Sequence, residues 1–364
     1  MIPPSVERKG PGVREISDGL LVVGRRGIIV QTKSREADAR DSTREAAWLD
    51  KQIRKAVRQI NCTARRFRAR GVDMTNGRGH RVHVDGPSID WAGVVIIDHP
   101  DPPDDYATPA TAGDVPHVVL LHRDWEFLFD QLRSTHAVVS YLHRIDASTE
   151  KLGTEPERYY ELAAADAAAP PGPLDPALEG TGDPRSVPIL PTAPAGIDDN
   201  AHSIVRTILE DIATTDIDPD RYTDRLDVLA SIESLPIAYR AELGHLLIEA
   251  LTACQQTEPD TTFWQFRTYL AGAGQDQLGF GVCSEFNETI RSAFGAWLRL
   301  RHHERISRTA PPTSPPFGVL LTPRDDGYRD WDTTMAAIQG DPQLTDAEVQ
   351  QYSALFKGGR IDAA

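Results

Sequence analysis

The chain has 364 residues, 40% of them hydrophobic and 26% charged, which is enough apolar material for more than one globular core. Its formal net charge of -15 argues against a protein that binds nucleic acid over its whole surface. The three widely spaced cysteines predict neither a disulfide framework nor a zinc ribbon, no apolar run approaches the ~20 residues of a membrane helix, and a reducing cytoplasm is expected.

Within this acidic chain the N-terminal part is basic. Residues 1–70 contain 17 Lys and Arg against 8 Asp and Glu, a net charge of +9, which leaves -24 for the remaining residues. An asymmetry of this kind indicates a basic interaction surface carried by an acidic protein. We therefore expect the N-terminal part, rather than the whole chain, to contact nucleic acid.

The first predicted element is a β-hairpin over residues 18–36, with the sequence DGLLVVGRRGIIVQTKSRE. Two apolar runs flank GRRG, which is typical of a tight turn between antiparallel strands. The register that we predict places Asp18 opposite Lys33 and Leu20 opposite Gln31. Since alternate residues of a strand share a face, the side chains of Asp18, Gln31 and Lys33 are expected to meet at one end of the hairpin.

A long helix is predicted next, beginning at Ser42 and ending near Gly71. Ser42 and Glu45 have the spacing of a capping box, and apolar residues then recur every three or four positions. The rest of the helix surface is strongly basic. Together with the two arginines of the hairpin turn, its basic residues are expected to contact the nucleic acid backbone. The predicted contacts are Arg25, Arg26, Lys51, Arg54, Lys55 and Arg58.

The remaining patterns predict two domains joined by a linker. Short β-like runs at 81–84, 94–97 and 117–121, a helix capped by Asp124 and a helix over 138–144 complete an α/β domain at residues 1–150. Residues 151–200 are rich in Pro and Ala and are predicted to form a linker.

Residues 201–364 are predicted to form a mainly helical domain. Their expected elements are helices at 204–212, 238–253 and 284–301, a strand at 317–321, and a last helix after a capping box formed by Thr345 and Glu348. This half carries no recognisable catalytic motif, and its acidity fits a surface for a protein partner.

The polar cluster of the hairpin suits the hydrolysis of a phosphodiester. Asp18 and Gln31 offer oxygen ligands of the kind that Mg²⁺ or Mn²⁺ accepts, and Lys33 can stabilise the attacking water and the developing charge. A simple ion pair between Asp18 and Lys33 at a strand edge explains the same residues without catalysis. From the residues alone, both interpretations stay open.

The same stretch resembles the PD-(D/E)XK nuclease superfamily, also called restriction-endonuclease-like. The family pattern is an acid at the start of one strand, an acid-x-Lys motif on the next strand and then a helix. Asp18, the Gln31-Thr-Lys33 triplet and the helix from Ser42 take these places here. The segments EISDGLLVV and KAVRQI are similar to bacterial nuclease-like proteins near the Mrr and NERD groups. The resemblance covers residues 5–70 and extends more loosely to residue 146.

This resemblance implies a restriction-endonuclease-like mixed sheet flanked by helices. It makes Asp18 the principal metal ligand, Lys33 the catalytic lysine, and Glu15 and Gln59 auxiliary residues. Gln31 departs from the pattern, because the family most often has Asp or Glu there and an amide oxygen brings no negative charge to a metal.

Two functions are therefore expected from the sequence. The first is a Mg²⁺-dependent nuclease of a bacterial defence, repair or mobile-element system. The second is a non-catalytic protein that uses the same fold as a scaffold for nucleic acid or a protein partner. Asp18 and Lys33 on a basic domain favour the first, whereas Gln31 and the overall negative charge favour the second.

Overall fold

The computed structural model divides the chain into two compact units, one formed by residues 1–167 and 192–195 and the other by residues 168–191 and 196–364. Among the residues described, no helix combines the length and the apolar character that crossing a bilayer requires. The structure describes residues 6–9, 12–15, 17–36, 41–77, 79, 81–109, 113–145, 151–168, 190–191, 195–215, 222–258, 261–271, 276–307, 316–324, 329–338 and 340–356.

The first unit is built on a four-stranded mixed sheet in the order β3-β4-β7-β8. Its strands are β3 (Gly19–Val23), β4 (Arg26–Ser34), β7 (Asp90–Asp98) and β8 (His117–Leu121). β3 and β4 are antiparallel, whereas β4, β7 and β8 are mutually parallel. Two small hairpins lie outside this sheet: β1 (Val6–Lys9) with β2 (Gly12–Glu15), and β5 (Val72–Thr75) with β6 (Arg81–Val84).

The predicted hairpin forms, but its register differs from the prediction by two residues. Val23 pairs with Arg26 and Leu20 pairs with Ile29, so that only Gly24 and Arg25 make the turn. Gly24 has a φ of 54°, which a residue without a side chain adopts readily and which suits a two-residue turn. Because a shift of two residues keeps every side chain on its own face, the predicted grouping of polar residues survives the wrong register.

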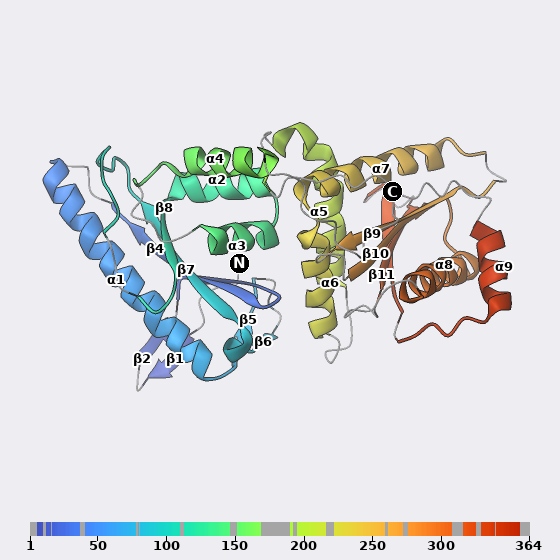
Figure 1. Ribbon diagram of the computed structural model, residues 1–364, viewed down its shortest axis with the longest axis horizontal. Helices are drawn as coiled ribbons and strands as arrows, with labels where there is room; N and C mark the ends of the chain where they lie inside the picture. Colours follow the sequence, from blue (N-terminus) through green and yellow to red (C-terminus); the bar gives the residue numbers. More distant parts are fainter. Residues whose placement is uncertain are drawn as a thin grey trace. The chain divides into compact units, whose positions relative to one another are not determined.

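One long helix, α1 (Ser42–Ala69), covers one face of this sheet, as Figure 1 shows. It packs there because its buried residues recur every three or four positions and form one apolar stripe. Close approach is possible because Gly93 of β7 has no side chain: a Cβ there would lie 2.6 Å from Cγ2 of Ile60. The stripe consists of Leu49, Ile53, Ala56, Val57, Ile60, Ala64 and Phe67.

The capping box predicted for α1 is wrong, although the helix begins at the predicted residue. Asp41 caps the helix instead, and its Oδ1 accepts a hydrogen bond from the backbone N–H of Arg44 at 3.0 Å. The Glu45 side chain turns inward and is almost fully buried. Asp124 does cap its helix as predicted, but from the third helical position, where Oδ2 accepts from the backbone N–H of Leu121 at 3.2 Å.

The opposite face of the sheet is covered by α2 (His122–Leu132) and α3 (Thr135–Arg144). A further helix, α4 (Glu155–Ala168), belongs to the same unit. Glu155 accepts hydrogen bonds from Tyr141 and Arg158, and Tyr159 packs against Tyr141 with ring centroids 5.6 Å apart. The predicted linker therefore cannot begin at residue 151, because residues 155–168 form a packed helix.

The second unit has its own four-stranded mixed sheet, in the order β12-β11-β10-β9. β9 (Trp264–Ala271) and β10 (Asp276–Cys283) form an antiparallel hairpin. α8 (Glu288–Ile306) then leads to β11 (Phe317–Pro323), which is parallel to β10, and β12 (Trp331–Ala337) closes the sheet antiparallel to β11. Both units thus contain the same succession of hairpin, helix and parallel strand.

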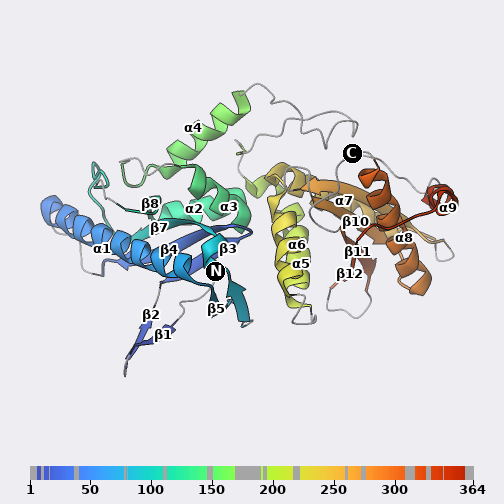
Figure 2. The ribbon, with the colours of Figure 1, turned by 60° about the horizontal axis from the view of Figure 1, so that its bottom comes forward.

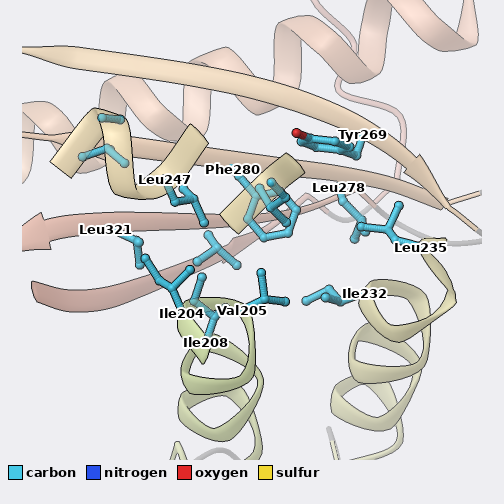
Figure 3. Packing of buried hydrophobic residues seen from close by; sticks show 14 of the residues in the cluster. Ile204, Val205, Ile208, Ile232, Leu235, Leu247, Tyr269, Leu278, Phe280 and Leu321 are labelled. Atoms are coloured by element: carbon cyan, nitrogen blue, oxygen red, sulfur yellow. The ribbon is translucent and has the colours of Figure 1, made fainter. Parts of the chain in front are cut away.

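Helices cover both faces of this second sheet (Figure 2). One face carries α5 (Asp199–Thr214), α6 (Tyr222–Ser234) and α7 (Ile237–Gln255), and the other carries α8 and α9 (Asp346–Phe356). In Figure 3, Ile204, Val205 and Ile208 of α5 point at Phe280 and Leu321 of the strands. The apolar stripe predicted for residues 204–212 is therefore the stripe that forms this core.

The second unit is not only helical. The sequence predicted β11 but missed β9, β10 and β12, so a mixed sheet stands at the centre of a part that was predicted to be mainly helical. The predicted capping box before α9 is confirmed. Thr345 Oγ1 accepts from the backbone N–H of Glu348 at 3.3 Å, and Glu348 Oε2 accepts from the backbone N–H of Thr345 at 2.9 Å.

Two glycines of the second unit give a matched test of its packing. Gly244 of α7 lies so close to α5 that a Cβ would come within 2.2 Å of the Ala201 carbonyl oxygen, whereas a Cβ at Gly295 of α8 would meet nothing within 4 Å. We expect Gly244→Ala to destabilise the unit by about 1–3 kcal/mol through overpacking. Gly295→Ala should instead stabilise it by about 0.5–1 kcal/mol, since Ala is the better helix former. Urea denaturation measures both, and equal effects of the two substitutions would contradict this packing.

Candidate active site

The candidate site lies at the end of the first sheet where β4 and β7 finish and β3 begins. Because β4, β7 and β8 are parallel, their carboxyl ends share one edge of the sheet. Asp18 immediately precedes β3, which runs in the opposite direction and so starts at this same edge. Open α/β sheets commonly bind ligands outside the carboxyl ends of their strands.

Three oxygen atoms at this edge surround the ammonium group of Lys33. Nζ donates to the Thr32 carbonyl oxygen at 2.9 Å and to Gln31 Oε1 at 3.4 Å. It also forms an ion pair with Asp18 Oδ2, at 3.7 Å. The structure therefore brings together the three residues that were predicted to converge, and it adds a backbone oxygen to them.

Asp18 is anchored by the backbone of the neighbouring strand. Its Oδ2 accepts a hydrogen bond from the Thr32 N–H at 2.6 Å, which fixes the carboxylate across from Gln31. The Asp18 side chain remains 37% exposed. A ligand arriving from solvent can therefore reach this carboxylate without any rearrangement of the strands.

Gln31 is the most buried member of the site, with only 1% of its surface exposed. Gln31 and Gly27 are four residues apart on β4 and therefore point to the same face of the sheet. Gly27 lies against Trp91, and the ring of Trp91 stacks on Phe67 of α1 with centroids 5.0 Å apart, so this is the face that α1 covers. A buried amide is stable when it is hydrogen-bonded, and Lys33 supplies that bond.

The environment of Lys33 disfavours its charged form. Partial burial lowers the pKa of Lys33, the Asp18 carboxylate opposes this effect, and the positive charge of Lys55 on α1 lowers the pKa further. The influence of Lys55 means that this exposed residue of the basic helix lies near the site. Perturbed groups of this kind are concentrated at functional sites, although structural ion pairs also produce them.

Two buried polar atoms near this edge have no partner among the described residues. They are the hydroxyl of Ser17, which precedes Asp18, and the carboxamide oxygen of Gln59 on α1. Gln59 lies one helical turn after Lys55, whose charge acts on Lys33. Unsatisfied buried polar groups are rare and often mark a bound water, an ion or a functional role.

The other predicted residues are not all part of this edge. Glu15 ends β2, but its side chain lies outside the described residues, so its auxiliary role stays a prediction. Arg25 and Arg26 lie at the opposite end of β4. The seven residue-to-residue steps from Arg26 to Lys33 span roughly 23 Å of strand. The structure therefore separates the turn arginines from the candidate site.

The predicted basic face of α1 is present in full. Lys51, Arg54, Lys55 and Arg58 are all exposed, and their spacing places them together on the side of the helix away from the sheet. Residues 51–70 contain eight Lys and Arg and neither Asp nor Glu. This face is thus strongly basic, with Arg54 paired to Asp50 Oδ2 at 4.0 Å and Lys55 near Lys33.

A buried cluster beside the site was missed in the sequence. Glu45 accepts bonds from Arg35 at 2.9 and 3.0 Å and from His99 Nε2 at 3.0 Å. The guanidinium of Arg35 lies 5.4 Å from the ring centroid of Trp48. No spacing in the sequence links these residues. The only available signal was that Arg35 and His99 each follow the end of a buried strand.

The donor set of the edge fits a hard cation only in part. Among the described residues, no group of three His, Cys, Asp or Glu side chains is placed to hold a metal. The oxygens of Asp18, Gln31 and Thr32 are of the type that Mg²⁺ accepts, and Mg²⁺ is often held by one or two carboxylates while it keeps several waters.

Comparisons with known proteins identify no relative. No family model matches the chain, and no curated protein or solved structure matches it significantly.

The burial of Lys33 predicts a pH-dependent effect of Lys33→Met. Because the folded state lowers the pKa of Lys33, the unfolded state binds more protons between that lowered pKa and the ordinary value of 10.5. The stability of the unsubstituted protein therefore rises with pH across this window, while Lys33→Met lacks this titration. We expect the free energy of unfolding of Lys33→Met, relative to the original protein, to fall as pH approaches 10.5.

Urea denaturation at several pH values measures this difference. Lys51→Met, which removes an exposed ammonium from α1, is the matched control. If the free energy of unfolding of Lys33→Met, relative to that of the original protein, stayed constant or rose with pH, the effect of burial would be contradicted.

Proposed function

We propose that the first unit is a restriction-endonuclease-like domain that hydrolyses phosphodiester bonds in DNA or RNA with the help of Mg²⁺ or Mn²⁺. The observation that carries the proposal is the convergence of Asp18, Gln31 and the Thr32 carbonyl on Lys33 at the carboxyl edge of the parallel strands. The succession of β3, β4 and α1 supports it, since the family pattern is likewise two strands followed by a helix.

Three oxygens would hold the metal: the Asp18 carboxylate, Gln31 Oε1 and the Thr32 carbonyl. When bound, Mg²⁺ polarises a phosphate and lowers the pKa of a coordinated water. Asp18 is fixed for this role by the Thr32 N–H and is open to solvent. The unpartnered oxygens of Ser17 and Gln59 can orient waters beside these ligands.

Lys33 supplies the positive charge at the reacting group. Its ammonium, held beside Asp18, can donate to a phosphate oxygen and stabilise the negative charge that develops there. Partial burial strengthens this electrostatic effect, because water screens the charge less. Lys55 lies near enough to add to the same positive potential.

The basic face of α1 is the proposed surface for the nucleic acid. Its four predicted contacts are exposed, and a stretch of 20 residues with eight basic and no acidic side chains outweighs the negative charge of the chain locally. Contacts of this kind go to phosphates and position a nucleic acid without selecting a sequence.

A second function is favoured by one specific observation. Lys33 already satisfies Gln31 and the Thr32 carbonyl, and Gln31 brings no charge that would favour a metal. A protein that had lost catalysis and kept the fold as a scaffold for nucleic acid would have this arrangement. Metal-dependent cleavage distinguishes the two functions.

The nuclease proposal predicts that Lys33→Ala lowers the rate of cleavage by about 10²–10³-fold, the usual effect of removing one group that stabilises the transition state. The assay follows supercoiled plasmid and labelled oligonucleotides with Mg²⁺ or Mn²⁺ and with EDTA. Lys151→Ala is the matched control, because Lys151 forms an exposed ion pair with Asp105 at 3.1 Å. Undiminished cleavage by Lys33→Ala would refute the proposed role, and salt-sensitive binding without any cleavage would support the scaffold.

Gln31→Glu tests the metal directly. It keeps the shape of the side chain and adds a negative charge beside Asp18, so we expect the Mg²⁺ concentration that gives half the maximal rate to fall. Gln31→Leu is the comparison, since it removes the oxygen and should raise that concentration. A titration of the cleavage rate with Mg²⁺ measures both, and an unchanged midpoint for Gln31→Glu would argue that Gln31 holds no metal.

A further inference from the structure

Arg35 follows β4 at the same edge as Lys33, and its side chain is held in one orientation. Its Nε donates to Glu45 Oε2 at 2.9 Å and its Nη2 donates to Glu45 Oε1 at 3.0 Å. The guanidinium also lies over the ring of Trp48, 5.4 Å from the centroid. A bidentate ion pair and an aromatic face together leave this planar group little freedom.

The partner of Arg35 is itself fixed. His99 Nδ1 accepts the backbone N–H of Asp101 at 3.1 Å, so Nε2 carries the ring proton and donates to Glu45 at 3.0 Å. The His99 side chain is fully buried, and its ring meets Trp48 edge to face at 5.5 Å. Arg35, Glu45 and His99 thus join the ends of β4 and β7 to the first turn of α1.

This pairing uses only part of the guanidinium. Arg carries five N–H donors, of which Glu45 takes one on Nε and one on Nη2. The Arg35 side chain is 20% exposed, and each of its nitrogens either has a hydrogen-bond partner or is accessible to solvent. Lys33 of β4 lies two residues before Arg35, and the positive charge of Lys55 acts on Lys33, so Arg35 extends a basic group that the Asp18 carboxylate balances only in part.

We propose that Arg35 binds a backbone phosphate of the nucleic acid, next to the phosphodiester that Lys33 contacts. This inference rests on the proposed function of the edge. The planar fork of Arg matches two oxygens of a phosphate, and a guanidinium already held by Glu45 and Trp48 loses little freedom on binding. Glu45 and His99 are positioning residues, because they reach the phosphate only through Arg35.

A pair of charge-neutral double substitutions tests the proposal. Arg35→Gln with Glu45→Gln leaves the net charge of the chain unchanged and replaces the ion pair by two amides that can still hydrogen-bond. We expect affinity for a short fluorescein-labelled DNA duplex, measured by anisotropy in EDTA, to fall about tenfold. The slope of log affinity against log salt should decrease by about 0.9, the loss of one phosphate contact. Single-stranded RNA of the same length forms a second arm that identifies the source of the phosphate.

The matched control is Arg144→Gln with Asp166→Asn. Arg144 and Asp166 form a bidentate pair at 2.6 and 2.8 Å that joins α3 to α4, and this pair should not affect binding. Glu45→Gln alone disturbs the same cluster but keeps the arginine and an amide oxygen that can accept from it, so it should lose less affinity than the double variant, whereas a merely structural role would predict equal losses. Thermal unfolding accompanies each variant. If the Arg35 double variant fails to fold, Arg35→Lys makes the comparison, because it keeps a cation for Glu45 and lacks the fork.

The outcomes separate the two proposals. If the original protein binds neither DNA nor RNA, the proposed function fails and the role of Arg35 fails with it. If the original protein binds and the Arg35 and Arg144 double variants bind equally well, the role of Arg35 alone is overturned. A reduced affinity and salt slope for the Arg35 variant only is the expected result.

Discussion

The packing of α1 along β4 and β7 is the contact on which the candidate site depends. Its apolar stripe fixes the helix against the sheet, and Gly93 lets Ile60 approach the strands closely. The same packing carries Glu45 to the ends of the strands, brings Lys55 near Lys33, and turns a row of basic residues outward. One hydrophobic contact therefore organises both the polar edge and the basic surface.

Gln31 determines how the chemistry of this edge is interpreted. It is buried at the position where a carboxylate would strengthen metal binding, and its amide oxygen is instead satisfied by Lys33. A buried carboxylate would need a compensating cation, whereas a buried amide needs only a hydrogen bond. Gln31 thus makes the edge stable in the absence of a metal, which is compatible with weak metal binding as well as with a scaffold.

Local patterns predicted the elements better than they predicted the contacts. α1, β6 and β8 lie where periodicity and alternation placed them, because amphipathic patterns are strong local signals. The hairpin register was wrong by two residues because Gly24 allows a tighter turn than GRRG suggested. The glycines of β10 hid that strand, since Gly279 and Gly281 are there to accommodate the side chains of α8 and β9.

The polar residues of the site show the same division. The convergence of Asp18, Gln31 and Lys33 followed from the alternation of side chains along a strand, which is unchanged when the register is wrong by two residues. The environment of Glu45 could not be predicted in this way. A glutamate three residues after a serine can close a capping box or form a buried ion pair, and only the tertiary structure distinguishes the two. Asp41, one residue before the predicted cap, formed the better bond and left Glu45 free to face Arg35 and His99.

The succession of hairpin, helix and parallel strand in both units has a consequence for the origin of the polar edge. Counted from the first pair after each hairpin turn, Gln31 and Lys33 of β4 correspond to Gly281 and Cys283 of β10. A Cβ on Gly281 would meet Phe266 of β9, and Cys283 is completely buried in the core that α8 covers. The same succession of elements can therefore close this end of its sheet with uncharged residues. A half-buried ammonium costs the first unit solvation energy, as its lowered pKa records. The second sheet thus contains an uncharged counterpart of the polar edge, so this architecture by itself does not require the charge of Lys33.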